Sequence, residues 1–221
     1  MNIYKNIKLE SFSYDSYWNG RDFNIRKKLF EREEIFSDWI KDKSKVLDVA
    51  VGNSYLPIYL KEKKGCDVTV YDLAQKVIDE YKKYGIRAEG KSIYDTANER
   101  GEVYDFIVMS EILEHLPMPE DVIKKMSERA EYLVISVPNS AFYRFRIQLL
   151  FGRFFKQWIH HPSEHLRFWS HVDFLDWLRA LELEVVKTEA SNGLDIGPLK
   201  LFKYFPNLFG HQMCYLVKNK K

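Results

Sequence analysis

The sequence predicts an α/β fold in which helices cover both faces of a mostly parallel sheet. Two observations lead to this prediction. Short apolar runs typical of buried strands alternate with helical patterns from residue 45 to residue 138. In addition, a turn of small residues joins the first of these strands to the helix that follows it. Such alternation is typical of βαβ units with right-handed crossovers.

The elements follow in order along the chain. Residues 1–40 form an N-terminal segment that we expect to be helical, because apolar side chains recur at helical spacing within 21–40. Strands are expected at 45–50, 67–72, 86–91, 104–110 and 132–138. Helices are expected between them at 54–65, 73–85 and 119–130. Each of these three helices has a residue suited to one of its ends, namely Pro57 and Gly65, Gly85, and Pro119.

The pattern changes after residue 138. Residues 140–169 are aromatic and basic without a clean strand, and we expect them to form a small cap. A helix is predicted at 170–181, where Ser170 and Asp173 fit a capping box. The last two strands are expected at 183–189 and 212–219. The sequence therefore predicts one domain, residues 1–221, with a cap insertion.

Composition limits the function. The 221 residues are 46% hydrophobic, which is enough for a full core, and the formal net charge of +2 gives no global footprint for nucleic acid. Cys66 and Cys214 lack metal-ligand spacing and are expected to be reduced thiols. The N-terminus has no apolar secretory core, and no uncharged stretch approaches the roughly 20 residues of a membrane span. We therefore expect a cytoplasmic protein without a transmembrane segment or a nucleic-acid partner.

The turn after the first strand carries the first functional motif, VLDVAVGNSYL at 46–56. Small residues allow the backbone to approach a ligand, and the helix that follows offers free N–H groups. Asp72 ends the next strand, 20 residues after Gly52. An acid at that place accepts hydrogen bonds from ribose hydroxyls in dinucleotide-type sites.

These residues resemble the class I S-adenosylmethionine-dependent methyltransferases, whose first motif reads acid-x-Gly-x-Gly-x-Gly. Asp48, Gly52 and Asp72 match, whereas Ala50 and Ser54 replace the first and third glycines. A residue other than glycine at positive φ costs about 1 kcal/mol or more. The segments SEILEHLPMPEDVIKKM (110–126) and YLVISVPNS (132–140) resemble the fourth- and fifth-strand regions of the same family.

The resemblance implies a Rossmann-like, doubly wound, mostly parallel seven-stranded sheet whose final strand is antiparallel. It also implies S-adenosylmethionine as the cofactor. Asp48 and the turn after it should lie near the methionine part, Asp72 at the ribose and Leu73 beside the adenine. Ser92 replaces the acid that usually binds the adenine amino group. The full expected cofactor set is Asp48, Val49, Ala50, Val51, Gly52, Asn53, Asp72, Leu73, Ser92, Ile93, Ser110 and Glu111.

Glu111, Glu114 and His115 follow the fourth strand and mark the expected catalytic edge. His115 suits a general base for an acceptor hydroxyl or amine, because the unperturbed pKa of histidine is about 6.5. Alternatively, Glu114 and His115 only cap and orient this loop. We assign Glu114, His115 and His165 as the catalytic candidates.

A divalent metal is a further alternative. Some metal-dependent members of the family carry a similar Glu-x-x-Glu-His followed by a later histidine, for which His165 is the candidate here. Carboxylates and imidazoles suit an ion that acidifies a hydroxyl. The crowded histidines of 160–165 are otherwise interpreted as substrate contacts or surface, so no metal ligand is assigned from spacing alone.

The cap is expected to supply the acceptor wall through Tyr143, Arg144, Arg146 and His161. Paired guanidinium groups suit a phosphate or carboxylate, which predicts an anionic acceptor. The opposite interpretation is that the apolar side chains of the cap belong to the core. A membrane-surface role would require them to be exposed.

The predicted reaction is methyl transfer to an oxygen or nitrogen atom of a small molecule or sugar. Two further resemblances add alternative functions. HLRFWS at 165–170 resembles a segment of polysaccharide-cluster methyltransferases, and residues 104–182 resemble the MetW-like proteins, which are associated with an acyltransferase of methionine synthesis. Under the second resemblance the chain is a partner subunit, and a homodimer is a further alternative.

Overall fold

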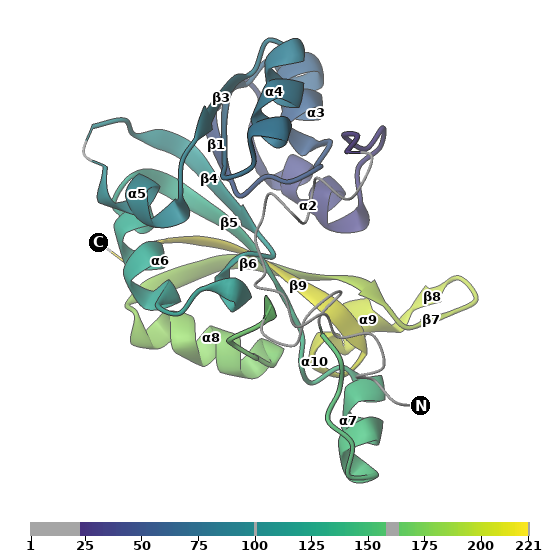
Figure 1. Cartoon of the computed structure of the whole chain (residues 1–221). Coiled ribbons are helices and arrows are strands. Elements are labelled where there is room, and N and C mark those ends of the chain that lie inside the picture. Colours follow the sequence, from purple (N-terminus) through teal and green to yellow (C-terminus); the bar gives the residue numbers. More distant parts are fainter. Residues whose placement is uncertain (1–22, 100, 158–163, 221) are drawn as a thin grey trace, which may run out of the picture.

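The computed structural model describes residues 23–99, 101–157 and 164–220. A seven-stranded sheet with the order β3-β2-β1-β4-β5-β9-β6 forms its centre (Figure 1). The strands are β1 (Lys45–Val49), β2 (Asp67–Asp72), β3 (Arg87–Gly90), β4 (Tyr104–Ser110), β5 (Ala130–Pro138), β6 (Leu183–Gly193) and β9 (Gly210–Asn219). The first five are parallel, and β9 runs antiparallel to both of its neighbours. The mostly parallel sheet and the antiparallel final strand are therefore confirmed.

Helices cover both faces of this sheet. One face packs against α2 (Glu31–Trp39), α3 (Leu56–Lys64) and α4 (Gln75–Lys83), and the other packs against α5 (Ile93–Asn98), α6 (Pro119–Ser127) and α8 (His171–Ala180). The central strands contribute to both layers. In β4, Phe106 and Val108 face the first layer, while Ile107 and Met109 face the second. Burial on both faces explains why these strands are continuous apolar runs in the sequence.

The expected helix over 21–40 is wrong in its first half. Residues 23–30 are not helical, and α2 begins only at Glu31. The backbone N–H of Arg26 donates to the Asn53 carbonyl, and its guanidinium pairs with Glu33. These contacts hold the segment in an irregular path over the β1 turn, so tertiary contacts decide where the helix starts.

Several short elements have no counterpart in the expectation. They are η1 (Leu113–His115), α5, α7 (Tyr143–Leu150), the hairpin of β7 (Asp195–Ile196) and β8 (Leu199–Lys200), α9 (Leu201–Tyr204) and α10 (Pro206–Phe209). The strand β6 also runs four residues beyond the expected end because its ladder with β9 continues to Gly193. A Cβ atom at Gly193 would lie 2.2 Å from the Cβ of Phe202, so only glycine lets α9 pack there.

None of the helices in the described part of the chain has the combination of length and apolar character that crossing a bilayer requires. The division of the chain into one domain, 1–221, with a cap at 140–169 stays a prediction. Within the expected cap, α7 is a helix where no regular element was expected.

Candidate active site

A cavity of about 770 Å³ opens at the carboxyl ends of β1, β2 and β4. The strand order reverses between β1 and β4, and ligands of such sheets bind at that point. All twelve residues expected to bind the cofactor line this cavity, together with Glu114, His115 and His165. The structure therefore brings the predicted cofactor and catalytic residues to one place, while their individual contacts with a ligand stay predictions.

The turn after β1 contains two residues in the left-handed region. Ala50 has φ 54° and Gly52 has φ 55°. The N–H of Ala50 donates to the Tyr71 carbonyl at 2.8 Å, which holds the strained residue in place. Alanine at the position of the family's first glycine thus keeps the glycine conformation at a cost of about 1 kcal/mol.

Asp72 fixes the same turn from the end of β2. Its carboxylate accepts hydrogen bonds from the N–H groups of Gly52 at 3.0 Å and Ala74 at 2.9 Å. Burial raises the pKa of this carboxyl, and the donated N–H bonds act in the opposite direction. Asp72 therefore supports the loop around the expected ribose position in addition to its predicted contact with the ribose.

Ser54 occupies the position of the family's third glycine and ties the turn to α2. Its hydroxyl donates to Glu33 at 2.7 Å and accepts from the N–H of Leu56 at 3.1 Å. Tyr81 of α4 donates to the Ser54 carbonyl at 2.6 Å. A serine here therefore provides contacts that glycine cannot.

Sequence reasoning missed four residues of this region: Arg26, Arg32, Glu33 and Tyr81. Three of them line the cavity, and Tyr81 supports it from behind. They come from flanking segments that carry no motif. The one available signal was the acid-rich first turn of α2, which would have marked Glu33 as a helix-start residue had the helix been placed correctly.

Ser92 lies at the start of α5 and caps that helix. Its hydroxyl donates to the Asp95 carboxylate at 2.8 Å and accepts from the Asp95 N–H at 3.0 Å. Because its only proton is used in this way, Ser92 can only accept from a ligand. That is the role predicted for it toward the adenine amino group.

Glu111 begins the expected catalytic edge directly after β4. Its φ is 53°, a conformation that residues other than glycine seldom adopt. The N–H of Glu111 donates to the Ser136 carbonyl at 3.1 Å, and its Oε2 accepts from Gln212 at 2.9 Å. Such strain at a cavity wall is typical of a functional position.

Glu114 is almost completely buried, with 1% of its surface exposed. Neither of its carboxylate oxygens has a hydrogen-bond partner among the described residues. Burial, and next the nearby charge of Glu111, raise the pKa of this carboxyl well above its usual range. Because an unpaired buried carboxylate is costly, this position favours a bound proton or a bound cation.

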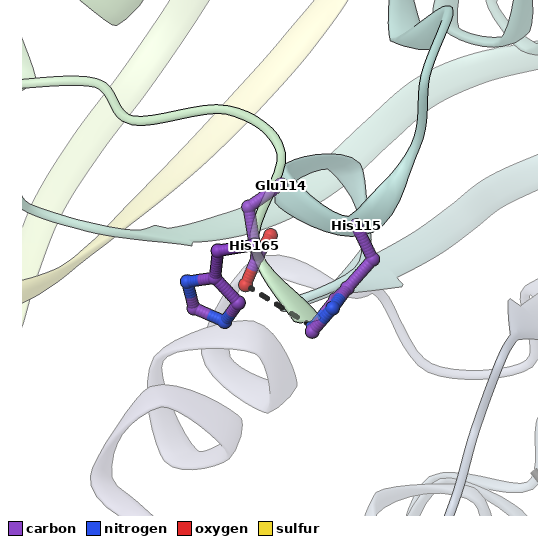
Figure 2. A group of neighbouring side chains, drawn as sticks. All are labelled: Glu114, His115 and His165. Carbon is purple, nitrogen blue, oxygen red and sulfur yellow. Dashed lines mark ion pairs between the residues drawn. The ribbon is translucent and has the colours of Figure 1, made fainter. Parts of the chain in front are cut away.

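Two histidines lie beside Glu114 (Figure 2). His115 is the next residue in the chain, whereas His165 comes from a segment far away in the sequence. The N–H groups of Leu166 and Arg167 donate to the Glu114 carbonyl at 2.8 Å and 3.1 Å and hold the segments together. The two imidazole rings meet edge to face, with centroids 4.7 Å apart.

Both imidazoles are neutral at pH 7. Burial lowers the pKa of His115, and burial together with the neighbouring His115 lowers the pKa of His165 to about 4. The Nδ1 of His115 contacts the backbone oxygen of Glu164, which can only accept, so Nδ1 carries the proton. The Nε2 of His115 therefore has a free lone pair, 3.9 Å from Oε1 of Glu114.

The three side chains form a potential metal site. One ligand atom from each of Glu114, His115 and His165 lies within 4.8 Å of the others. One carboxylate and two neutral imidazoles suit a divalent transition metal. Within the described part of the chain no group hydrogen-bonds to the Glu114 oxygens, which fits such an ion. Glu111, the other acid of the motif, lies outside this group of three.

Comparison with known proteins identifies the family. A family model described as a methyltransferase domain matches residues 21–188. The chain belongs to this methyltransferase family. This is the family that the resemblance of the first motif predicted, with S-adenosylmethionine as the expected cofactor.

The curated relatives of this methyltransferase are distant. A ubiquinone biosynthesis O-methyltransferase of Bordetella avium is 30% identical over 99 residues, which cover 39% of this chain and 41% of the relative. A protein of the same name from Xanthomonas oryzae is 24% identical over 152 residues, covering 64% of this chain and 63% of the relative. The chain therefore spans less than two thirds of the length of these relatives.

A solved structure shows the same fold. The 1,6-didemethyltoxoflavin-N1-methyltransferase of Burkholderia thailandensis, with bound S-adenosylhomocysteine, superimposes with a TM-score of 0.58. The match covers 86% of this chain and 77% of that chain at 14% identity. At this identity the likeness supports the Rossmann-like fold and does not identify the acceptor.

The expected acceptor wall needs a correction. Tyr143, Arg144 and Arg146 do not line the cavity, and both arginines are exposed. Arg146 instead donates to the carbonyls of Ala141 and Asn207. His161 lies outside the described residues. The cap reaches the cavity through other residues, Lys156 and Gln157, so the pair of arginines on which the anionic acceptor was predicted is not at the site.

Proposed function

We propose that this methyltransferase transfers a methyl group to a hydroxyl oxygen of a small molecule or sugar, and that Glu114, His115 and His165 hold a divalent cation beside that oxygen. One observation carries the proposal: a buried carboxylate without any hydrogen bond from the described residues lies against two neutral imidazoles. The curated relatives are O-methyltransferases by name, which is consistent with this proposal.

A bound cation would lower the pKa of the acceptor hydroxyl. Among the residues of the chain, the Glu164 carbonyl orients His115, and the N–H groups of Leu166 and Arg167 fix Glu114. The β1 turn and Asp72 line the same cavity and would hold the cofactor there. Methyl transfer is an in-line displacement, so the protein contributes mainly by orienting the donor and acceptor.

A second mechanism uses the same residues without a metal. The lone pair on Nε2 of His115 can take the proton of the acceptor directly. His115 then acts as the general base, while Glu114 carries a proton of its own, as its raised pKa favours. This mechanism also allows an amine acceptor.

A metal-dependence assay separates the two mechanisms. The chelated enzyme is given labelled S-adenosylmethionine and a panel of small phenols, nucleotide sugars and amino acids, with and without Mg²⁺, Mn²⁺ or Zn²⁺. We expect activity only after metal is returned. The Glu114→Gln variant should then lose about 10²–10⁴-fold in turnover, the range of a lost proton-transfer step. Glu128→Gln, at the exposed residue directly after α6, should keep full activity.

Undiminished turnover after exhaustive chelation, and in Glu114→Gln, would eliminate the metal. The variant His115→Ala then tests the base mechanism. If cofactor binding is intact and no member of the panel is methylated, the partner-subunit interpretation, with an acyltransferase as the expected partner, becomes the preferred one.

A further inference from the structure

The segment from Tyr143 to Gln157, here called the α7 surface, projects from the body of the molecule next to α10 (Figure 1). It consists of α7 and the chain that returns from it to the cavity. Most of its large apolar side chains are in solvent. The exposed fractions are 50% for Ile147, 47% for Leu149, 81% for Leu150, 77% for Phe151 and 55% for Phe154. The interpretation that these side chains belong to the core is therefore wrong for these five.

The charge of the α7 surface has one sign. From Asn139 to Gln157 the sequence contains no Asp or Glu, and its basic residues are Arg144, Arg146, Arg153 and Lys156. All four basic side chains are exposed. The surface therefore combines exposed apolar groups with exposed basic groups, and its own sequence contributes no acidic side chain.

A small aromatic cluster holds this surface in place. Phe145 stacks on Phe155 with ring centroids 4.6 Å apart, and Phe142 meets His211 at 5.0 Å. Phe142, Phe145 and Phe155 are buried. The next residue after Phe155 is Lys156, which lines the cavity. The exposed side chains are thus attached to a fixed support beside the mouth of the active site.

We propose that the α7 surface docks the enzyme onto an anionic phospholipid bilayer. Large exposed apolar side chains on a soluble fold mark an interaction site. Interfacial binding needs apolar groups that enter the boundary between headgroups and acyl chains by about 5–10 Å, with basic groups at the level of the headgroups. The five apolar and four basic side chains of the α7 surface supply both.

Charge favours a bilayer over a second copy of the chain as the partner of the α7 surface. A symmetric dimer through the α7 surface would bring its basic residues against those of the partner copy, and like charges across an interface are costly. Negatively charged headgroups instead attract each Lys or Arg that lies near the membrane surface. The proposal concerns this surface only and does not depend on which acceptor the cavity takes.

Vesicle cosedimentation of the full chain tests the proposal. The probes are vesicles of phosphatidylcholine alone and of phosphatidylcholine mixed with phosphatidylglycerol, at 0.1 M salt and at high salt. We expect binding to the anionic vesicles and little to the neutral ones, with loss at high salt as the electrostatic attraction is screened. Equal binding to both kinds of vesicle, or to neither, would overturn the proposal.

Two double variants locate the binding surface. Arg144→Gln with Arg153→Gln should weaken binding to anionic vesicles about 25-fold, since each basic residue contributes about fivefold. Leu150→Ser with Phe151→Ser should also weaken binding to the anionic vesicles at 0.1 M salt, although all four basic side chains remain. A control on α4 and the residue after it combines Lys82→Gln, Lys83→Gln and Tyr84→Ala. It removes exposed basic and aromatic groups that do not line the cavity, and it should bind as the wild type does.

Each variant is also tested for binding of S-adenosylhomocysteine, which should be unchanged because neither double variant touches the cavity lining. This control separates docking from the methyl-transfer chemistry. If the control on α4 loses vesicle binding as strongly as the α7 variants, the location is wrong. If the wild type is a dimer that the α7 variants dissociate without any change in vesicle binding, the surface joins two copies of the chain instead.

Discussion

His115 and His165 make the chemistry of the site depend on pH. Both histidines have a pKa below the usual 6.5, and that of His165 is about 4. Each residue must be neutral to offer a lone pair, either to a cation or to a proton of the acceptor. Protonation removes that lone pair, so the active form is the one present at higher pH.

The first prediction is the position of the acid limb of the pH profile. We expect kcat/KM to stay constant between pH 7 and pH 6.5 and to fall only below pH 6.5, because the pKa of His115 lies below that value. Initial rates between pH 4.5 and 8, with cofactor affinity measured at each pH, check this. A decline that begins above pH 7 would contradict neutral, buried imidazoles.

Asp72 has two tasks, which gives a second prediction. Replacing Asp72 by Ala removes the predicted ribose contact and the acceptor of the Gly52 N–H. The affinity for S-adenosylhomocysteine should fall by about 1–3 kcal/mol, the usual cost of losing hydrogen bonds to a charged group. Calorimetry measures this fall, and Asp67→Ala at the exposed start of β2 is the control. Equal affinity of both variants would remove Asp72 from the cofactor site.

At the scale of the elements, the central strands could be predicted from the sequence almost to the residue. Most of their side chains are buried on both faces, so apolar residues fill most positions and form recognisable runs. The helix α7 could not be predicted, because residues 142–158 are rich in apolar groups without a clear helical period. The start of α2 was misplaced because Ile25 and Leu29 continue its spacing upstream, while contacts of Arg26 hold that segment out of the helix.

The candidate site likewise contains residues that the sequence could place and others that it could not. Asp48 and Asp72 lie at the carboxyl ends of β1 and β2, and Glu114 follows β4. Because parallel strands end at one edge, sequence order was enough to bring these residues together. Glu33 and Tyr81 reach the same turn from helices on the flank. Their presence depends on how α2 and α4 dock, which no local pattern records.

The aromatic support of α7 yields a third prediction. Phe145→Ala removes the buried ring that joins α7 to Phe155 and His211. Because the surrounding cluster is small and separate from the main core, α7 should loosen while the sheet stays folded. Hydrogen exchange should accelerate within 143–157 and stay unchanged in β4. Leu149→Ala, which removes an exposed side chain of the same helix, is the matched control; faster exchange throughout the sheet would contradict an independent cap.

At the scale of the whole molecule, the cofactor cavity joins elements from both halves of the sheet. It is lined by residues of α2, of the turns after β1 and β2, and of the chain after β4. A ligand bound there contacts the two halves at once. Binding should therefore stabilise the entire fold, in addition to ordering the local loops.

The fourth prediction is a thermal shift. At a concentration of S-adenosylhomocysteine about 100 times Kd, binding stabilises a protein by about 2.7 kcal/mol. For a chain of this size, Tm should rise by roughly 5–10 °C. Scanning calorimetry with and without ligand measures it, with Asp72→Ala expected to shift less at the same concentration. An unchanged Tm in millimolar ligand would contradict cofactor binding at this cavity.

The place of β9 has a consequence for how the chain is made. This strand lies between β5 and β6 and is the only strand that pairs with β6 in the described sheet. While the protein is still being synthesised, β1 to β5 can pair as they leave the ribosome, but β6 has no partner in the sheet. The edge of β5 stays open until residue 219 has emerged. The nascent chain therefore carries an unprotected sheet edge until β9 has been made, and a chaperone would be needed most during that interval.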